Sequence, residues 1–172
     1  AMTRKIAVFN QKGGVGKTTT VINLADALAN KGHRVLILDM DPQGNATSGL
    51  NVDKDRDPMI YDFLLGGEGD FIVPIKENLD IIPSGATLAG IEIEFARREG
   101  WQTVLKEHMA QMEGYDYIIM DCPPSLGILS ILALTAADGI LIPVQCEYYA
   151  LEGLSQLMES IQLVRGGFNP DL

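Results

Sequence analysis

The sequence contains few cysteines, few aromatic residues and no long apolar run. Two cysteines and 6% aromatic residues occur in 172 positions. No apolar run approaches the ~18 residues of a transmembrane helix. The two cysteines, Cys122 and Cys146, lie in apolar, strand-like contexts, which favours buried, reduced thiols and excludes a disulfide framework. No signal peptide is visible, so we expect a cytoplasmic protein.

Basic residues are also scarce. Thirteen Lys and Arg stand against 23 Asp and Glu, which gives a net charge of −10. Non-specific binding to nucleic acid depends on clustered Lys and Arg that neutralise phosphates. We therefore expect this chain to bind DNA weakly or not at all by itself.

Apolar runs alternate with helical patterns along the chain, which is typical of one doubly wound α/β domain over 1–172. The predicted strands are 5–9, 34–39, 79–83, 117–121 and 139–144. The predicted helices are 17–31, 60–65, much of 88–112, 126–137 and 151–164. This alternation predicts a mostly parallel sheet with helices on both faces, a Rossmann-like three-layer fold. Ligands of such sheets bind at the carboxyl ends of the strands.

Residues 11–19 read Q-K-G-G-V-G-K-T-T and directly follow the apolar run 6–9. A strand, a glycine-rich turn and a helix N-terminus direct backbone N–H groups at one anionic centre, as in the P-loop of nucleotide triphosphatases. Lys17 would then reach the β- and γ-phosphates, and the Thr18 hydroxyl would complete a Mg²⁺ shell. The predicted cofactors are ATP or ADP and Mg²⁺. The predicted phosphate-binding residues are Gly13, Gly14, Val15, Gly16, Lys17, Thr18 and Thr19.

The loop departs from the usual G-x-x-x-x-G-K-[ST] pattern, because Gln11 stands where a glycine is usual and Lys12 adds a second cation. No arginine lies near this loop in the sequence. We therefore expect Lys12 to act on the transition state, either in cis or from a partner subunit, as an arginine finger does.

A second polar segment, Asp39-Met40-Asp41-Pro42-Gln43-Gly44-Asn45, follows the predicted strand 34–39. Its composition is that of a turn, and a turn is compatible with a functional loop. Asp41 is the better candidate for positioning the attacking water near the γ-phosphate. Asp39 would act indirectly, on the loop or on the metal.

The apolar strand 117–121 ends in Asp121, the form of a Walker B element, in which the carboxylate holds Mg²⁺ directly or through water. The following residues 123–125 would reverse the chain near the γ-phosphate and act as a nucleotide-sensing switch. Because phosphoryl transfer to water needs positioning and charge neutralisation, the predicted activity is ATP hydrolysis.

Four motifs together resemble the deviant-Walker-A partition ATPases, and within them the small ParA/Soj proteins. The motifs are K-G-G-V-G-K-T-T, D-M-D-P-Q-G-N-A-T-S-G-L, D-C-P-P-S-L-G and P-V-Q-C-E-Y-Y-A-L-E-G-L, which span residues 12–154. The resemblance implies an ATPase that dimerises with ATP and binds DNA non-specifically as that dimer. It also implies stimulation by a ParB-type partner, in a bacterial or archaeal cytoplasm and near the nucleoid.

The resemblance also assigns roles to single residues. Lys12 would cross the interface of an ATP-sandwich dimer to the partner's phosphates, and Glu147 would support that lysine. Thr19 would contact the α-phosphate, Asp41 would serve hydrolysis and Asp121 would be the Walker B carboxylate. Family members usually continue for another third of their length. We therefore expect a shortened chain that lacks much of the basic DNA-binding surface.

Three alternatives remain open. A MinD-type membrane-cycling ATPase would need a C-terminal amphipathic helix, and the stretches D-P-Q-G-N and E-Y-Y-A-L-E-G favour the segregation branch. A nitrogenase-reductase-like iron–sulfur protein would need cysteines in loops at a dimer axis, which fits Cys122 and Cys146 poorly. The third alternative is a fragment that binds nucleotide without turnover.

Overall fold

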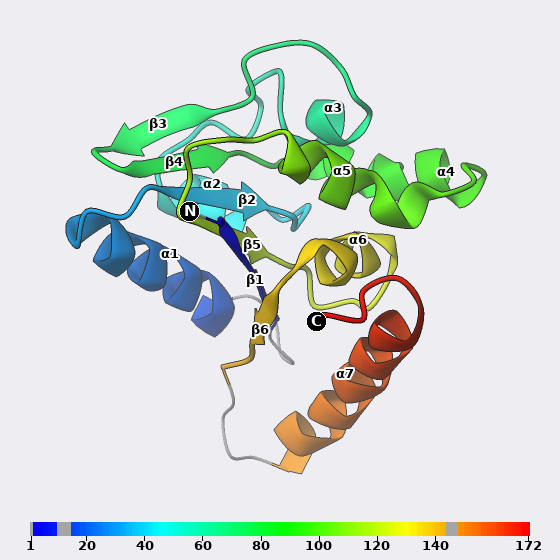
Figure 1. Cartoon of the computed structure of the whole chain (residues 1–172). Helices are drawn as coiled ribbons and strands as arrows, with labels where there is room; N and C mark the ends of the chain where they lie inside the picture. Colours follow the sequence, from blue (N-terminus) through cyan, green and yellow to red (C-terminus); the bar gives the residue numbers. More distant parts are fainter. Residues whose placement is uncertain (1, 10–14, 144–147) are drawn as a thin grey trace.

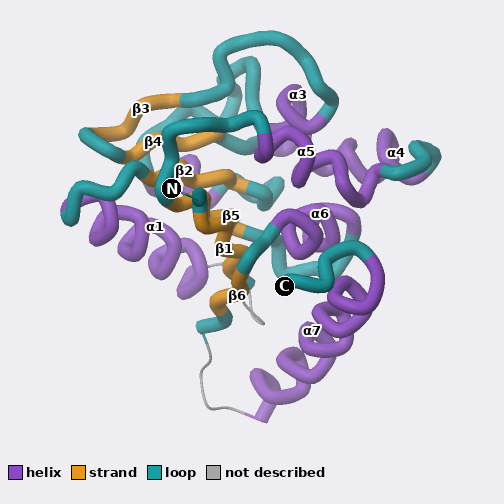
Figure 2. The backbone as a smooth tube through the Cα atoms, in the orientation of Figure 1, coloured by secondary structure: helices purple, strands orange, loops and turns teal. Residues whose placement is uncertain are grey.

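The structure, a computed structural model, describes the backbone of residues 2–9, 15–143 and 148–172 (Figures 1 and 2). Within these ranges six strands form one sheet in the order β3-β4-β2-β5-β1-β6. All neighbours are parallel except the antiparallel pair β3 and β4. The strands are β1 (Arg4–Val8), β2 (Val35–Asp39), β3 (Val73–Lys76), β4 (Leu79–Ile82), β5 (Tyr117–Asp121) and β6 (Gly139–Leu141). The predicted mostly parallel sheet is confirmed.

Helices cover both faces of this sheet (Figure 1). They are α1 (Val15–Asn30), α2 (Asn45–Gly49), α3 (Ile60–Leu64), α4 (Ile91–Ala96), α5 (Val104–Ala110), α6 (Ile128–Ala136) and α7 (Tyr148–Gly167), with 3₁₀ turns η1 (Ala86–Gly90) and η2 (Trp101–Thr103). The prediction that much of 88–112 is helical is confirmed by α4, η2, α5 and most of η1, although this helical region is not continuous. It is broken at Gly100, whose φ of 75° is left-handed. No helix in the described ranges is long and apolar enough to cross a membrane.

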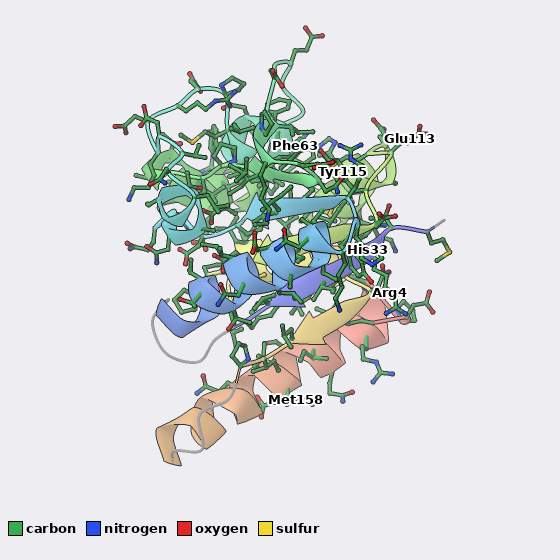
Figure 3. The ribbon with its side chains drawn as sticks, turned by 90° about the vertical axis from the view of Figure 1, so that its left-hand side faces the viewer. Arg4, His33, Phe63, Glu113, Tyr115 and Met158 are labelled. Carbon is green, nitrogen blue, oxygen red and sulfur yellow. The ribbon has the colours of Figure 1, made fainter. Side chains whose placement is uncertain are left out.

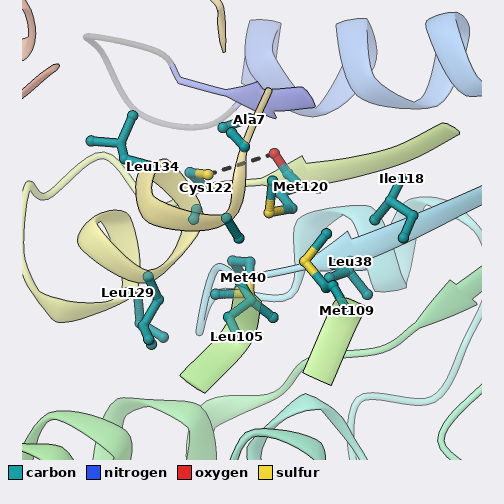
Figure 4. Packing of buried hydrophobic residues seen from close by; sticks show 14 of the residues in the cluster. Ala7, Leu38, Met40, Leu105, Met109, Ile118, Met120, Cys122, Leu129 and Leu134 are labelled. Carbon is teal, nitrogen blue, oxygen red and sulfur yellow. Dashed lines mark hydrogen bonds between the residues drawn. The ribbon is translucent and has the colours of Figure 1, made fainter. Parts of the chain in front are cut away.

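The strands divide their apolar side chains between two layers, because successive residues point to opposite faces. On one face Ile37 and Ile119 pack with Val21 and Ala25 of α1. The other face packs against α3 to α7, and Figure 4 shows part of this layer, where Leu38, Met40, Ile118 and Met120 meet Leu105, Met109 and Leu134. Strands covered on both faces explain why 117–121 is continuously apolar.

The strand register brings three carboxyl ends to one edge of the sheet. Val8 of β1 and Asp39 of β2 both lie opposite Asp121 of β5. Backbone bonds continue the ladder one residue further, from Met40 N–H to the Asp121 carbonyl and from Cys122 N–H to the Val8 carbonyl. The carboxyl ends of these three strands are therefore neighbours.

The opposite edge of the sheet holds a polar cluster of its own. The Tyr115 hydroxyl donates to Asp80 Oδ2 at 2.6 Å. Arg34 Nη2 lies 3.5 Å from the same oxygen, and the guanidinium sits 4.9 Å from the Tyr115 ring centroid. Burial and the bond to Asp80 raise the pKa of Tyr115, which keeps the hydroxyl protonated. Figure 3 shows Tyr115, Glu113 and His33 together at this end.

The last residues fold back onto the core. Asn169 is buried, and its amide donates to the carbonyls of Leu134, at 3.0 Å, and of Ala137, at 2.7 Å. Both carbonyls lie at the end of α6, where helix carbonyls lack intrahelical partners. Leu172 packs against the same apolar layer as α6. The segment after α7 therefore closes the end of α6.

Candidate functional site

Helix α1 begins at Val15, within the predicted phosphate-binding segment 11–19. Lys17 and Thr18 lie in its first turn, beside Asp121 at the carboxyl end of β5. The N–H groups of a first turn have no intrahelical partners and carry the positive end of the helix dipole, so they attract anions. Val21 and Ala25 anchor the helix on the sheet. This anchoring fixes where the first turn points.

The Lys17 ammonium is buried within the cluster of strand ends, with 1% of the residue exposed. Its Nζ lies 2.7 Å from Asp121 Oδ1 and 3.3 Å from Asp41 Oδ2, and it donates to the backbone carbonyl of Cys122. Burial lowers the pKa of Lys17, but the charges of Asp121 and Asp41 outweigh this effect and raise it. Lys17 is therefore a cation in this site.

Asp121 and Thr18 present two oxygen groups side by side. The Thr18 hydroxyl donates to Asp121 Oδ2 at 3.4 Å. Asp121 Oδ1 is buried and accepts no hydrogen bond in the described residues beyond its ion pair with Lys17. Burial raises the pKa of Asp121, and the Lys17 charge opposes that rise.

A hydroxyl and a carboxylate are hard oxygen ligands that fit Mg²⁺, which usually takes one or two protein ligands and completes its shell with water and phosphate. In the described residues no group of three or more His, Cys, Asp and Glu could hold a metal. The pair Thr18 and Asp121 therefore fits a magnesium ion that arrives with a nucleotide better than an all-protein metal cage.

Asp41 lies in the loop after β2, facing Lys17. Its Oδ2 contacts the ammonium, while its Oδ1 accepts a 3.0 Å bond from the Gln43 N–H. The residue is 2% exposed. This places a buried carboxylate within reach of the first turn of α1, as the sequence predicts for the residue that positions water.

Asp39 ends β2, and its carboxylate contacts the backbone of the Asp41 loop and Thr47. Its Oδ2 accepts from the Thr47 N–H at 3.0 Å and the Thr47 hydroxyl at 2.6 Å, and its Oδ1 accepts from the Asp41 N–H at 3.2 Å. Burial, and then the charge of Asp121, raise the pKa of Asp39 to about 7. Its described hydrogen bonds thus order the Asp41 loop and do not reach α1.

Several residues in the site were missed by sequence reasoning. The Cys122 carbonyl accepts from Lys17, Ser84 contacts Asp41, and Thr47 bonds both Asp39 and Ser84. Hydroxyl residues are common in turns, and a backbone carbonyl has no signature in sequence. The Cys122 thiol itself is buried as predicted, and burial raises its pKa, which keeps it protonated and unreactive.

The remaining predicted residues divide into two groups. Val15 and Gly16 open α1, and Thr19 is exposed beside Thr18. The others lie outside the residues that the structure describes: Lys12, Gly13, Gly14, Cys146 and Glu147.

Residues 3–172 match a protein-family model described as an AAA domain. The chain is 55% identical to the sporulation initiation inhibitor protein Soj of Bacillus subtilis, over 99% of this chain and 70% of that protein. It is 50% identical to the chromosome partitioning protein ParA of Myxococcus xanthus, over 98% of this chain and 62% of that protein. The chain thus spans roughly two thirds of the length of these relatives.

Solved structures match the fold across nearly the whole chain. A Mycobacterium smegmatis structure, named cobyrinic acid a,c-diamide synthase with bound ADP and magnesium, has a TM-score of 0.94 and 42% identity, covering 99% of this chain and 71% of that one. A putative plasmid partition protein of Borrelia burgdorferi bound to AMPPNP has a TM-score of 0.86 and 31% identity, over 95% and 70%. These neighbours confirm the P-loop ATPase fold, and bound nucleotides in both agree with the predicted cofactors. The chain belongs to the ParA/Soj family of chromosome-partitioning ATPases.

Proposed function

We propose that this chain binds ATP with Mg²⁺ at the first turn of α1 and hydrolyses it to ADP and phosphate, as the nucleotide switch of a DNA-segregation system. One observation carries the proposal. Lys17, Asp41 and Asp121, from three separate elements, meet as a buried cluster at the carboxyl edge of the sheet. Parallel α/β sheets bind ligands at this edge. Membership of the ParA/Soj family supports the same reaction and its biological setting.

The residues would divide the chemistry as follows. Lys17, which stays cationic, turns from its two carboxylates to the β- and γ-phosphates and neutralises charge there. Asp41 accepts a hydrogen bond from water and orients it toward the γ-phosphate. Thr18 and Asp121 would hold Mg²⁺, the latter directly or through water, and the ion would supply further charge neutralisation. No covalent intermediate on the protein is required.

The other predicted positions complete the proposal. Gly13, Gly14, Val15 and Gly16 would direct backbone N–H groups at the phosphates, with Thr19 at the α-phosphate. Their support is the loop sequence and its place between β1 and α1.

We propose that ATP joins two copies of the chain, with Lys12 acting across the interface and Glu147 supporting it, and that a ParB-type protein stimulates hydrolysis. Family membership supports this assembly. Residues 1–172 would act as one ATPase domain. With a net charge of −10, this chain should bind DNA weakly or not at all. A salt-sensitive shift of a DNA duplex by submicromolar protein with ATP would contradict that expectation.

The test combines light scattering on a sizing column with phosphate release, in Mg²⁺ plus ATP and in Mg²⁺ plus ADP. Wild type should dimerise with ATP only and release phosphate. Asp41→Ala should keep the dimer without releasing phosphate, and Lys12→Ala should stay monomeric. A monomer that binds ATP without phosphate release would instead favour the nucleotide-binding fragment. A wild type that does not bind ATP would overturn the proposal.

A further inference from the structure

A closed ring of hydrogen bonds surrounds the backbone of Asp41. The Asp41 N–H donates to Asp39 Oδ1 at 3.2 Å, and the Thr47 hydroxyl donates to Asp39 Oδ2 at 2.6 Å. The Ser84 N–H donates to Thr47 Oγ1 at 2.9 Å, and the Ser84 hydroxyl donates back to the Asp41 carbonyl at 2.8 Å. Asp39, Thr47 and Ser84 are fully buried. The Asp41 N–H is thus held by Asp39, two residues earlier, and the Asp41 carbonyl is held by Ser84, which is distant in the sequence.

Three elements contribute to this ring. Asp39 ends β2, Thr47 lies in the short helix α2, and Ser84 follows β4 by two residues. The Thr47 hydroxyl connects Asp39 to Ser84, because it donates to the Asp39 carboxylate and accepts from the Ser84 N–H at the same time. A hydroxyl can do both, whereas a methyl group of the same size can do neither. Loss of this hydroxyl would leave a buried carboxylate oxygen and a buried N–H each short of a partner.

The ring matters for chemistry because of what it fixes. The Asp41 side chain has few degrees of freedom once its backbone is set, and a misplacement of about 1 Å in a catalytic site can reduce the rate about 100-fold. Lys17 and the Gln43 N–H contact the Asp41 side chain, and the Gly44 N–H donates to the Asp41 carbonyl at 2.9 Å within the same loop. When Lys17 turns to a phosphate, the ring remains as the support of the Asp41 backbone.

We propose that Thr47 and Ser84 are positioning residues for ATP hydrolysis, which act by holding Asp41 where it orients water. This inference rests on the proposed role of Asp41. It concerns residues that touch neither phosphate nor metal in the proposed site, and it predicts an effect on turnover separate from nucleotide binding.

The test measures kcat and KM for ATP, together with the thermal midpoint, in matched variants. Thr47→Val removes the hydroxyl at nearly constant volume, and Thr47→Ser keeps it. Thr135→Val is the control, because Thr135 is also fully buried but its hydroxyl has no hydrogen-bond partner in the described residues. Ser84→Ala provides a second break in the ring that removes only the bond to the Asp41 carbonyl.

We expect Thr47→Val and Ser84→Ala to lower kcat about 10-fold or more, with KM within about twofold of wild type. Thr47→Ser should recover most of kcat, and Thr135→Val should match wild type. In an Asp41→Ala background, Thr47→Val should cause no further loss, because the ring acts through Asp41. If Thr47→Val does not fold, Ser84→Ala alone decides between a positioning role and none.

Two kinds of failure are distinguishable. An active wild type whose kcat is unchanged in Ser84→Ala and in folded Thr47→Val overturns the positioning role alone. A further loss from Thr47→Val in the Asp41→Ala background also overturns it. A wild type without ATP turnover, or an Asp41→Ala variant as active as wild type, contradicts the proposed function and the inference with it.

Discussion

The Lys17 ammonium lies 2.7 Å from Asp121 Oδ1, and both side chains are withdrawn from solvent. With Asp41 at 3.3 Å, one buried cation is shared by two buried carboxylates. Breaking a buried ion pair by removing one partner is more costly than the pair is stabilising, because the remaining charge stays desolvated. Removal of the same lysine that would bind phosphate should therefore destabilise the fold in the absence of nucleotide.

Replacement of Lys17 by Gln should lower the free energy of unfolding by about 3 kcal/mol, because two carboxylates lose their cation. Urea unfolding in EDTA, without nucleotide, measures this change. Lys76→Gln is the control, since Lys76 forms an exposed pair with Asp26 that should contribute less than about 1 kcal/mol. Equal losses in the two variants would contradict a stabilising role for the buried cluster.

Asp39 should make stability depend on pH. Its pKa of about 7 in the folded chain exceeds the ordinary value of 3.8, so between these values the folded state holds a proton that the unfolded state releases. The free energy of unfolding therefore falls as pH rises through this window, by at most about 1.4 kcal/mol per pH unit from this group.

Asp39→Asn removes this titration. Urea unfolding of both chains from pH 4.5 to pH 8 should show wild type losing more stability than the variant as pH rises. Parallel curves for the two chains would mean that Asp39 titrates near its ordinary pKa.

Gly44 should be intolerant of a side chain for two reasons. Its φ of 64° is left-handed, and an added Cβ would lie 3.1 Å from the Ser84 carbonyl and 2.7 Å from Lys54 Cδ. Gly44→Ala should cost about 1 to 2 kcal/mol of backbone strain plus the displacement of these neighbours. Gly32→Ala, at φ 91° with nothing within 4 Å, carries the strain alone. Thermal unfolding should give Gly44→Ala a lower midpoint than Gly32→Ala. The reverse order would contradict close packing of Gly44 against Ser84 and Lys54.

Asn169 should contribute to stability far more than its position near the end of the sequence suggests. Asn169→Ala would leave the Leu134 and Ala137 carbonyls buried without this donor, at about 1 to 3 kcal/mol for each group. Asn30→Ala removes only exposed bonds, one to Asp26 and one from Lys76, and should change stability by less than about 0.5 kcal/mol. Denaturant unfolding of the two variants checks the difference, which would vanish if the segment after α7 were loosely attached.

The central strands and α1 could be predicted because their signals are local. The runs before the phosphate loop, before Asp39 and before Asp121 are apolar, and each ends in a residue with evident chemistry. Strand β3 was missed because Val73–Lys76 is only four residues long and contains Pro74. It pairs antiparallel at the sheet edge, where proline is tolerated. Helix α2 was missed because Asn45–Gly49 is composed of turn-forming residues.

Part of the candidate site could also be predicted from local sequence signals. Lys17, Asp41 and Asp121 are charged residues that directly follow apolar runs or a glycine-rich turn. A charge at such a position needs a partner when it is buried, so each of the three could be singled out from the sequence. Thr47 and Ser84 could not be singled out in this way, because an uncharged hydroxyl occurs as readily on the surface as in a buried site. Only the fold, which brings the ends of β2 and β4 together, shows that they share a hydrogen bond.

The cluster of Arg34, Asp80 and Tyr115 lies at the end of the sheet opposite Lys17, Asp41 and Asp121, so the two ends can be addressed separately. Because β5 runs from Tyr117 to Asp121, this cluster and the carboxyl ends of the strands are separated by about one strand length, roughly 15 Å. A surface tether at exposed Glu113, beside the cluster, would leave the carboxyl ends of the strands facing solution. Immobilised in that orientation, the chain would present the proposed ATP site without obstruction by the support.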